Sequence, residues 1–315
     1  MTEAYKDHRL DRLFRPRSIA LIGASDGSSF SNLCNANLNA IGFAGRRFQV
    51  NLRGATAHGH PSVTSCRHFG EQVDAAYICV PGVGLMDAVA DAVEAGIKNM
   101  VVVTAGFAET GEAGLQRQQE FQKYCVKNDV RVLGPNSLGF RNHIDKVSLG
   151  ALAFSEQSVE PTIGAITASG AVGSLMAWYA NQQAVGLTHV VATGNEMNIA
   201  AADVIDYLVE HPKVRGIVMF LEAIRDTASF VAAAEKARAA KKPIVVLKAG
   251  ASASTAAVVA AHTGSFVGDD RVFNAACDRL GVVRVSTVEP PRLSRRLLFV
   301  RRSFRDEQDP EQVFT

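Results

Sequence analysis

The stretch Ser18-Ile19-Ala20-Leu21-Ile22-Gly23-Ala24-Ser25 decides the expected fold of the chain. Its mostly apolar residues 18–22 predict a buried strand, and the small residues 23–25 follow that strand directly. A strand, a tight turn and a helix together bind nucleotide phosphates, because backbone N–H groups and the helix N-terminus face the anion. The pattern is weaker than a full G-x-G-x-x-G motif, since serines replace the later glycines at 28–31. Asp26 must point away from any pyrophosphate, which its charge would repel.

The same alternation continues through the first half of the chain. Each further apolar run is followed by turn-forming residues and then by a helical apolar period. These runs predict strands at residues 48–50, 76–80, 100–103 and 131–133. We therefore expect a doubly wound parallel sheet in a Rossmann-like domain over residues 1–146, with ligands beyond the carboxyl ends of its strands.

Arg53 discriminates between possible nucleotide ligands. It follows the second expected strand, where an NAD site needs an acidic residue for the ribose hydroxyls. An arginine suits a phosphorylated ribose instead, such as that of NADP or coenzyme A. An ordinary surface arginine is an equally good interpretation of this residue alone.

A second α/β alternation begins at residue 162. Residues 147–161 have no helical or strand period and are expected to form a linker, and residues 289–315 a C-terminal tail. Strands are expected at 163–167, 189–193, 217–221, 243–247 and 282–285. They predict a second doubly wound parallel sheet over residues 162–288.

Three polar side chains follow strands of this second sheet. Ser169 is placed to cap a helix whose first N–H groups, from Gly170 and Ala171, form an anion site. Glu222 comes directly after the strand at 217–221, and His262 lies on a loop of small residues after the strand at 243–247. Because the carboxyl ends of parallel strands meet at one edge, we expect all three to face one cleft.

Such a group of residues suits phosphoryl transfer through a phosphohistidine. The carboxylate holds the proton of one ring nitrogen, and the other nitrogen attacks phosphorus. Taken alone, Ser169 is explained equally well as the cap of an ordinary helix, and His262 as an ordinary loop histidine.

Composition limits the function classes. The chain has 315 residues, 47% hydrophobic and 20% charged, with a formal net charge of +2, which argues against a nucleic-acid or membrane partner. Its polar first residues and lack of a long apolar run lead us to expect a cytoplasmic protein. Five cysteines without paired spacing are expected to be packed, reduced thiols. His58 and His60, near Cys66, are expected in a solvated turn, and no metal site is predicted.

Seven short motifs occur in an order and spacing that resemble a known family. They are residues 13–25, 50–51, 105–111, 134–139, 168–171, 221–224 and 262–265. From about residue 10 to residue 285 the chain is similar to the NDP-forming acyl-CoA synthetases and to the α subunit of succinyl-CoA synthetase.

The resemblance implies that the first domain binds CoA and that the second, flavodoxin-like domain carries the phosphorylated histidine. His262 would be that residue, Glu222 its orienting carboxylate, and Ser169, Gly170, Ala171 and Gly264 would hold the phosphate. The residues implied to bind CoA are Gly23, Ala24, Ser25, Asn51, Arg53, Val80, Pro81, Thr104 and Asn136.

The resemblance also implies a reaction and a partner. Phosphate attacks an acyl-CoA thioester, the histidine takes the phosphoryl group from the acyl phosphate, and a nucleoside diphosphate receives it. Nothing in the chain resembles an ATP-grasp domain, so an ATP-grasp β subunit or domain is expected to hold the nucleotide with Mg²⁺. A homo-oligomer is a further possibility.

Departures from the family pattern support an alternative. The chain has Ala251-Ser252 where the family usually has an Arg-Thr or Arg-Ser pair, and Ala261 where a serine usually precedes the histidine. A catalytically inactive CoA-binding or regulatory module is therefore the second hypothesis. A nucleotide-cofactor oxidoreductase, suggested only by the turn at Gly23, is disfavoured by Arg53.

Overall fold

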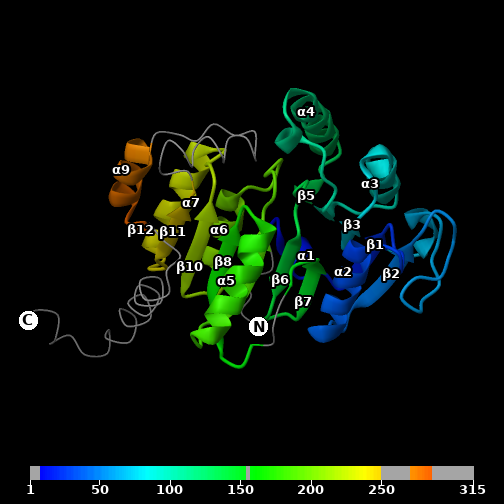
Figure 1. Ribbon diagram of the computed structural model, residues 1–315, viewed down its shortest axis with the longest axis horizontal. Coiled ribbons are helices and arrows are strands. Elements are labelled where there is room, and N and C mark those ends of the chain that lie inside the picture. The colour runs from blue at the N-terminus through cyan, green and yellow to red at the C-terminus, as the bar shows by residue number, and fades with distance from the viewer. Residues whose placement is uncertain (1–7, 154–156, 250–269, 286–315) are drawn as a thin grey trace, which may run out of the picture.

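A computed structural model describes residues 8–153, 157–249 and 270–285, which form two α/β units lying side by side (Figure 1). The first unit contains five parallel strands in the order β2-β1-β3-β4-β5. They are β1 (Ser18–Ile22), β2 (Arg46–Val50), β3 (Ala75–Ile78), β4 (Asn99–Val102) and β5 (Arg131–Leu133). The intervening helices are α2 (Ser29–Ala40), α3 (Leu85–Glu94) and α4 (Glu112–Lys127), with short 3-10 turns η2 (Cys66–Phe69), η3 (Gly82–Gly84) and η4 (Ala108–Thr110).

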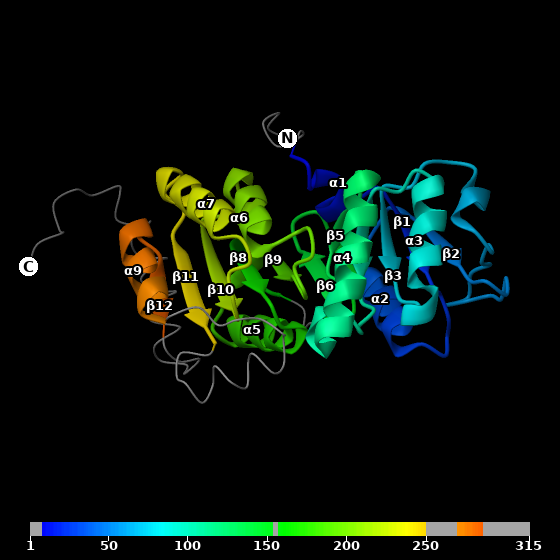
Figure 2. The same ribbon diagram turned by 90° about the horizontal axis from the view of Figure 1, so that it is seen from above.

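The second unit is built on a seven-stranded sheet in the order β12-β11-β10-β8-β9-β6-β7. Its strands are β6 (Gly139–Asn142), β7 (Val147–Gly150), β8 (Pro161–Thr167), β9 (Gly186–Ala192), β10 (Gly216–Leu221), β11 (Ile244–Lys248) and β12 (Val283–Val285). Its described helices are α5 (Gly170–Gln182), α6 (Ala201–Glu210), α7 (Thr227–Ala239) and α9 (Asp270–Leu280). Seen from above, α6 and α7 cover one face of the sheet and α5 lies on the other (Figure 2).

The predicted fold class, two consecutive doubly wound α/β units, is confirmed. The central strands are buried along their whole length, as the apolar runs required, because helices on both faces exclude water from a parallel sheet. Within the described residues, no helix combines the length and hydropathy needed to cross a bilayer. All five cysteines are free thiols, and all but Cys79 are buried.

A hairpin corrects the predicted linker. Strands β6 and β7 pair antiparallel, and β6 also pairs antiparallel with β9. The prediction of a linker over 147–161 was therefore wrong for Val147–Gly150, and the predicted domain end at 146 cuts the hairpin. Gly139 and Gly150 face each other in its register, where a Cβ atom on Gly139 would lie 2.1 Å from the carbonyl oxygen of Leu149. The close approach of the two backbones explains these glycines.

The two units share a hydrophobic core. The short N-terminal helix α1 (Asp11–Phe14) inserts Phe14 between Phe140 of β6 and Tyr207 of α6, with ring centroids 4.8 Å away in each case. On the other side, the Asn37 side chain in α2 donates hydrogen bonds to the carbonyls of Gly150, at 2.9 Å, and Leu152, at 2.8 Å. These contacts hold the two units in one arrangement and fix the position of the residues between them.

Candidate active site

The turn at 23–25 has the predicted backbone but not the predicted free N–H groups. Gly23 has φ +90°, and a Cβ atom there would lie 2.9 Å from the carbonyl oxygen of Cys79. The N–H groups of Gly23 and Ala24 both donate to Val50 at 3.0 Å, and that of Ser25 donates to the Ser31 hydroxyl at 3.0 Å. The expectation that these N–H groups face an anion was therefore wrong, since the turn uses them to bind the second strand and α2.

His58 holds Asp26, the residue that follows this turn. The His58 side chain is only 4% exposed, with Nε2 2.8 Å from Ser31 Oγ and Nδ1 3.2 Å from Asp26 Oδ1. The backbone N–H of His58 also donates to Asp26, at 2.7 Å. The expectation of a solvated turn was thus wrong for His58, while His60 is exposed. The Asp26 side chain thus contacts both the backbone and the side chain of the histidine.

The other residues predicted to bind CoA lie near the carboxyl ends of the first sheet's strands. The Asn51 side chain donates to the Ala24 carbonyl at 2.7 Å and accepts from the Arg53 N–H at 2.9 Å. Thr104 donates its hydroxyl to the Val80 carbonyl at 2.7 Å. These side chains hold the loops at this edge of the sheet in place by hydrogen bonds to backbone groups. Pro81 and Arg53 are exposed on it.

A cavity of about 160 Å³ lies between the two units, at the carboxyl end of the second sheet. Four predicted site residues line it: Asn136, Ser169, Gly170 and Glu222. Four other polar residues line it that the sequence did not indicate: Glu109, Asn195, Glu196 and Arg225. Ala171 is exposed and not among the lining residues, while His262 and Gly264 lie outside the described part of the chain.

The N-terminus of α5 forms one wall of this cavity. Ser169 is the extended cap residue, and its Oγ accepts a 3.5 Å hydrogen bond from the Val172 N–H. Helix geometry leaves the preceding N–H groups of the first turn without an intrahelical acceptor. Gly170 is required by packing, because a Cβ atom there would lie 2.4 Å from Cδ1 of Leu138. The wall therefore presents backbone donors and the positive end of the helix dipole.

Glu109 and Asn195 join the two units at the cavity. The Asn195 side-chain nitrogen donates to Glu109 Oε2 at 2.5 Å, and the N–H groups of Gly106 and Phe107 donate to Oε1 at 2.5 and 3.1 Å. Burial opposes ionisation of Glu109, but these hydrogen bonds outweigh it and lower its pKa. The Glu109 carboxylate is thus ionised, with both oxygens engaged.

Glu196 lies on the loop after β9, in a left-handed backbone conformation with φ +54°. Such a conformation costs a non-glycine residue about 1–2 kcal/mol and is found where the surrounding structure enforces it. Burial raises the pKa of Glu196 to about 7, against the opposing effects of a Thr193 hydrogen bond and the charge of Arg225. Its carboxyl group is therefore partly protonated near neutral pH.

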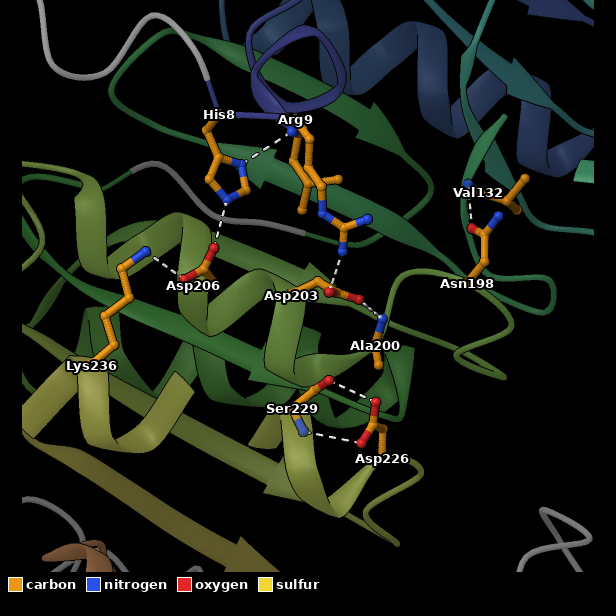
Figure 3. A network of polar contacts seen from close by, with 11 residues as sticks. His8, Arg9, Val132, Asn198, Ala200, Asp203, Asp206, Asp226, Ser229 and Lys236 are labelled. Atoms are coloured by element: carbon orange, nitrogen blue, oxygen red, sulfur yellow. Dashed lines mark hydrogen bonds and ion pairs between the residues drawn. The ribbon is translucent and has the colours of Figure 1, made fainter. Parts of the chain in front are cut away.

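The loop that carries Glu196 is pinned at several points. The Asn198 side chain accepts from the Val132 N–H and donates to the Val130 carbonyl, both at 2.8 Å. Asp203 accepts from the Ala200 N–H at 2.8 Å and pairs with Arg9 (Figure 3). These contacts hold the loop against β5 and the start of α6, and so restrict the position of Glu196.

Sequence signals for the additional cavity residues were present but weak. Glu109 belongs to the 105–111 motif, and Glu196 follows a predicted strand, as Glu222 does. The sequence does not show whether carboxylates at the ends of different strands lie at one site, because it does not show which strands are adjacent. The structure shows β8, which precedes Ser169, between β9 and β10.

Comparisons with known proteins agree with this architecture. Residues 17–143 match a family described as CoA binding domain, and residues 160–290 one described as succinyl-CoA ligase like flavodoxin domain. The Pyrococcus furiosus protein named ADP-forming acetate–CoA ligase II subunit alpha is 32% identical over 281 residues, which is 89% of this chain and 60% of that protein. A trans-feruloyl-CoA synthase from an unknown prokaryotic organism is 31% identical over 290 residues, covering 90% of this chain and 41% of that protein.

A solved structure extends the likeness to three dimensions. The acetyl-coenzyme A synthetase 1 of Ca. Korarchaeum cryptofilum, in complex with phosphate and ADP, superposes with a TM-score of 0.83 at 28% identity, over 90% of this chain and 60% of that one. The chain thus spans 60% or less of the length of these three relatives. The chain therefore contains a CoA binding domain followed by a succinyl-CoA ligase like flavodoxin domain, and over about nine tenths of its length it is similar to proteins named as ADP-forming acyl-CoA ligases.

Proposed function

We propose that the chain is the α-type part of an NDP-forming acyl-CoA synthetase and works with an ATP-grasp subunit or domain. One observation carries the proposal. Ser169, Gly170 and Glu222 from the second unit share a cavity with Asn136 from the first. A thioester bound along the first sheet's edge would meet a phosphate there.

The proposed chemistry has two bond exchanges on this chain. Phosphate attacks the thioester carbon, the C–S bond breaks, and CoA leaves as acyl phosphate forms. A ring nitrogen of His262 then attacks phosphorus, and the acid leaves with the bridging oxygen. Glu222 holds the other ring nitrogen's proton, and the α5 N-terminus stabilises the phosphoryl oxygens. The partner carries the NDP, with Mg²⁺, that receives the phosphoryl group.

CoA is the proposed thiol substrate of the first unit. Gly23, Ala24, Ser25, Val80 and Pro81 would contact it where the backbone approaches closely. Arg53 supplies an exposed cation at the same edge, suited to the phosphate on the CoA ribose.

A turnover assay with the partner tests the proposal. The chain and an ATP-grasp partner are incubated with ADP, phosphate and either acetyl-CoA or feruloyl-CoA, and ATP formation and thiol release are followed together. We expect ATP and thiol in equal amounts, loss of both in His262→Asn, and unchanged yields in the exposed α4 control Glu120→Gln. Thiol release without ATP would contradict the phosphohistidine route.

The second candidate is an inactive CoA-binding or regulatory module, favoured by Ala251 and Ala261, which replace residues usual in the family. Both lie outside the described residues. Calorimetric binding of CoA, combined with no ATP formation from any acyl-CoA in the presence of an active partner, would favour this candidate.

A further inference from the structure

Glu196 approaches the cavity from the side of β9, whereas the α5 N-terminus follows β8. It has no assigned part in the proposed chemistry. Glu196 nevertheless lines the same cavity as Ser169 and Gly170.

The two carboxyl oxygens of Glu196 have different surroundings. Oε1 accepts hydrogen bonds from the Thr193 hydroxyl, at 2.8 Å, and from the Ala201 N–H, at 3.3 Å. Oε2 has no hydrogen-bond partner among the residues that the structure describes. The side chain is therefore oriented by one oxygen, and the other can donate or accept a further hydrogen bond.

We propose that Glu196 is a phosphate-binding residue, whose protonated Oε2 donates a hydrogen bond to a phosphate held against the N-terminus of α5. The inference rests on the proposed function for the identity of the bound anion. It adds a donor to the lining of the cavity, contributed by a group that would repel the same anion if ionised.

Burial favours this proton and outweighs the opposing charge of Arg225. Glu109 and Glu222 line the cavity, and Asp203 in α6 also disfavours a further negative charge at Glu196. Arg225, exposed on the loop after β10, is the cationic side chain among the lining residues; its charge lowers the pKa of Glu196 and attracts the anion. A bound dianion adds negative charge beside Glu196, so anion binding and proton uptake are coupled.

Sulfate is the most informative probe, because its charge does not change near neutral pH whereas that of phosphate does. Sulfate binding to the full chain is measured by calorimetry between about pH 6 and about pH 8. We expect wild-type affinity to fall by up to about ten-fold per pH unit above pH ~7, as Glu196 ionises. Glu196→Gln, which keeps an N–H donor at all pH values, should show a clearly shallower profile, and the exposed control Glu120→Gln the wild-type profile.

A second measurement needs no variant. Sulfate binding at about pH 7.5 in two buffers of different ionisation enthalpy gives the number of protons taken up, which we expect to be a substantial fraction of one. Zero proton uptake, no sulfate binding at about pH 6, or identical pH profiles for wild type and Glu196→Gln would overturn the inference.

Failure of this inference is distinguishable from failure of the proposed function. A chain that binds CoA and yields ATP with its partner, but binds sulfate without proton uptake, keeps the function and loses the role of Glu196. Proton-linked sulfate binding in a chain that forms no ATP keeps the anion site and loses the ligase.

Discussion

The Asn195 side chain donates to Glu109 at 2.5 Å, linking the flavodoxin-like domain to the CoA-binding domain at the edge of the cavity. Asn195 also donates to Gln118 in α4 at 2.9 Å. Both domains therefore shape the proposed phosphate site, and a change at this contact should affect stability as well as activity.

Asn195→Asp places a carboxylate against the ionised Glu109. We expect the free energy of unfolding to fall by about 2–3 kcal/mol, because two like charges meet and a buried donor is lost. Urea unfolding at pH ~7 measures the change. The double variant Asn195→Asp with Glu109→Gln restores an amide donor and should recover much of the loss. A double variant no more stable than the single one would contradict this account.

Gly194 should be intolerant of any side chain. It has φ +62°, and a Cβ atom there would lie 2.5 Å from the Pro135 carbonyl oxygen and 2.7 Å from that of Asn136. We expect Gly194→Ala to cost about 2–4 kcal/mol, combining backbone strain with overpacking against backbone that cannot move aside. Gly42→Ala is the matched control, since Gly42 has φ +72° and open space around it. Its cost should be about 1 kcal/mol. Equal costs in urea unfolding would refute the steric argument.

Arg53 should discriminate between CoA and dephospho-CoA. We expect Arg53→Gln to weaken CoA binding by about ten-fold or more, since a charge-assisted hydrogen bond to phosphate contributes about 1.5–3 kcal/mol. Dephospho-CoA binding should be unchanged. Arg46→Gln, at the amino end of β2, the strand that precedes Arg53, is the control and should bind both ligands normally. Parallel losses for both ligands in Arg53→Gln would rule out a contact with the ribose phosphate.

The buried histidines should make the fold less stable in mild acid. Burial lowers the pKa of His211 to about 4 and that of His189 well below its usual value. Between about pH 6.5 and pH 4 the unfolded chain binds more protons at these residues, so their contribution to stability falls as pH falls. The raised pKa of Glu196 has the opposite effect, because its contribution to stability falls as pH rises. The effect of the histidines is therefore measured by comparing variants with wild type.

His189→Leu isolates the largest of these effects. Both ring nitrogens of His189 lack a hydrogen-bond partner in the described part of the chain, although the side chain is fully buried. We expect the variant to be at least as stable as wild type at pH ~7 and to lose less stability at pH ~5. The exposed control His60→Gln should retain the wild-type pH dependence. Urea unfolding at both pH values measures the change. A larger loss of unfolding free energy on acidification in His189→Leu than in wild type would contradict the expectation.

The parallel strands could be predicted because each is an apolar run bounded by turn residues. The hairpin β6–β7 could not be predicted, since each of its strands has only four residues. The polar residues Arg141 and Asn142 in β6 and Ser148 in β7 are typical of a loop. These side chains are buried by tertiary packing against neighbouring strands and α1, which short-range periodicity does not register.

The candidate site was predicted in part for a similar reason. Ser169 and Glu222 were identified because they follow strands directly, and the adjacency of β8 and β10 brings them to one cavity. The contact between Glu109 and Asn195 depends instead on how the two domains pack. Glu196 gained significance only from its left-handed backbone and its place in the lining of the cavity. Neither property is visible in the residue pattern.

Phosphorylation of His262 beside Glu222 is the central claim, and the chemical stability of the phosphoryl label tests it most directly. The chain is incubated with acyl-CoA and labelled phosphate, and the protein-bound label is followed in acid and in base. The account predicts an acid-labile, base-stable label that is absent in His262→Asn and strongly reduced in Glu222→Gln. A label of undiminished amount in His262→Asn would contradict it.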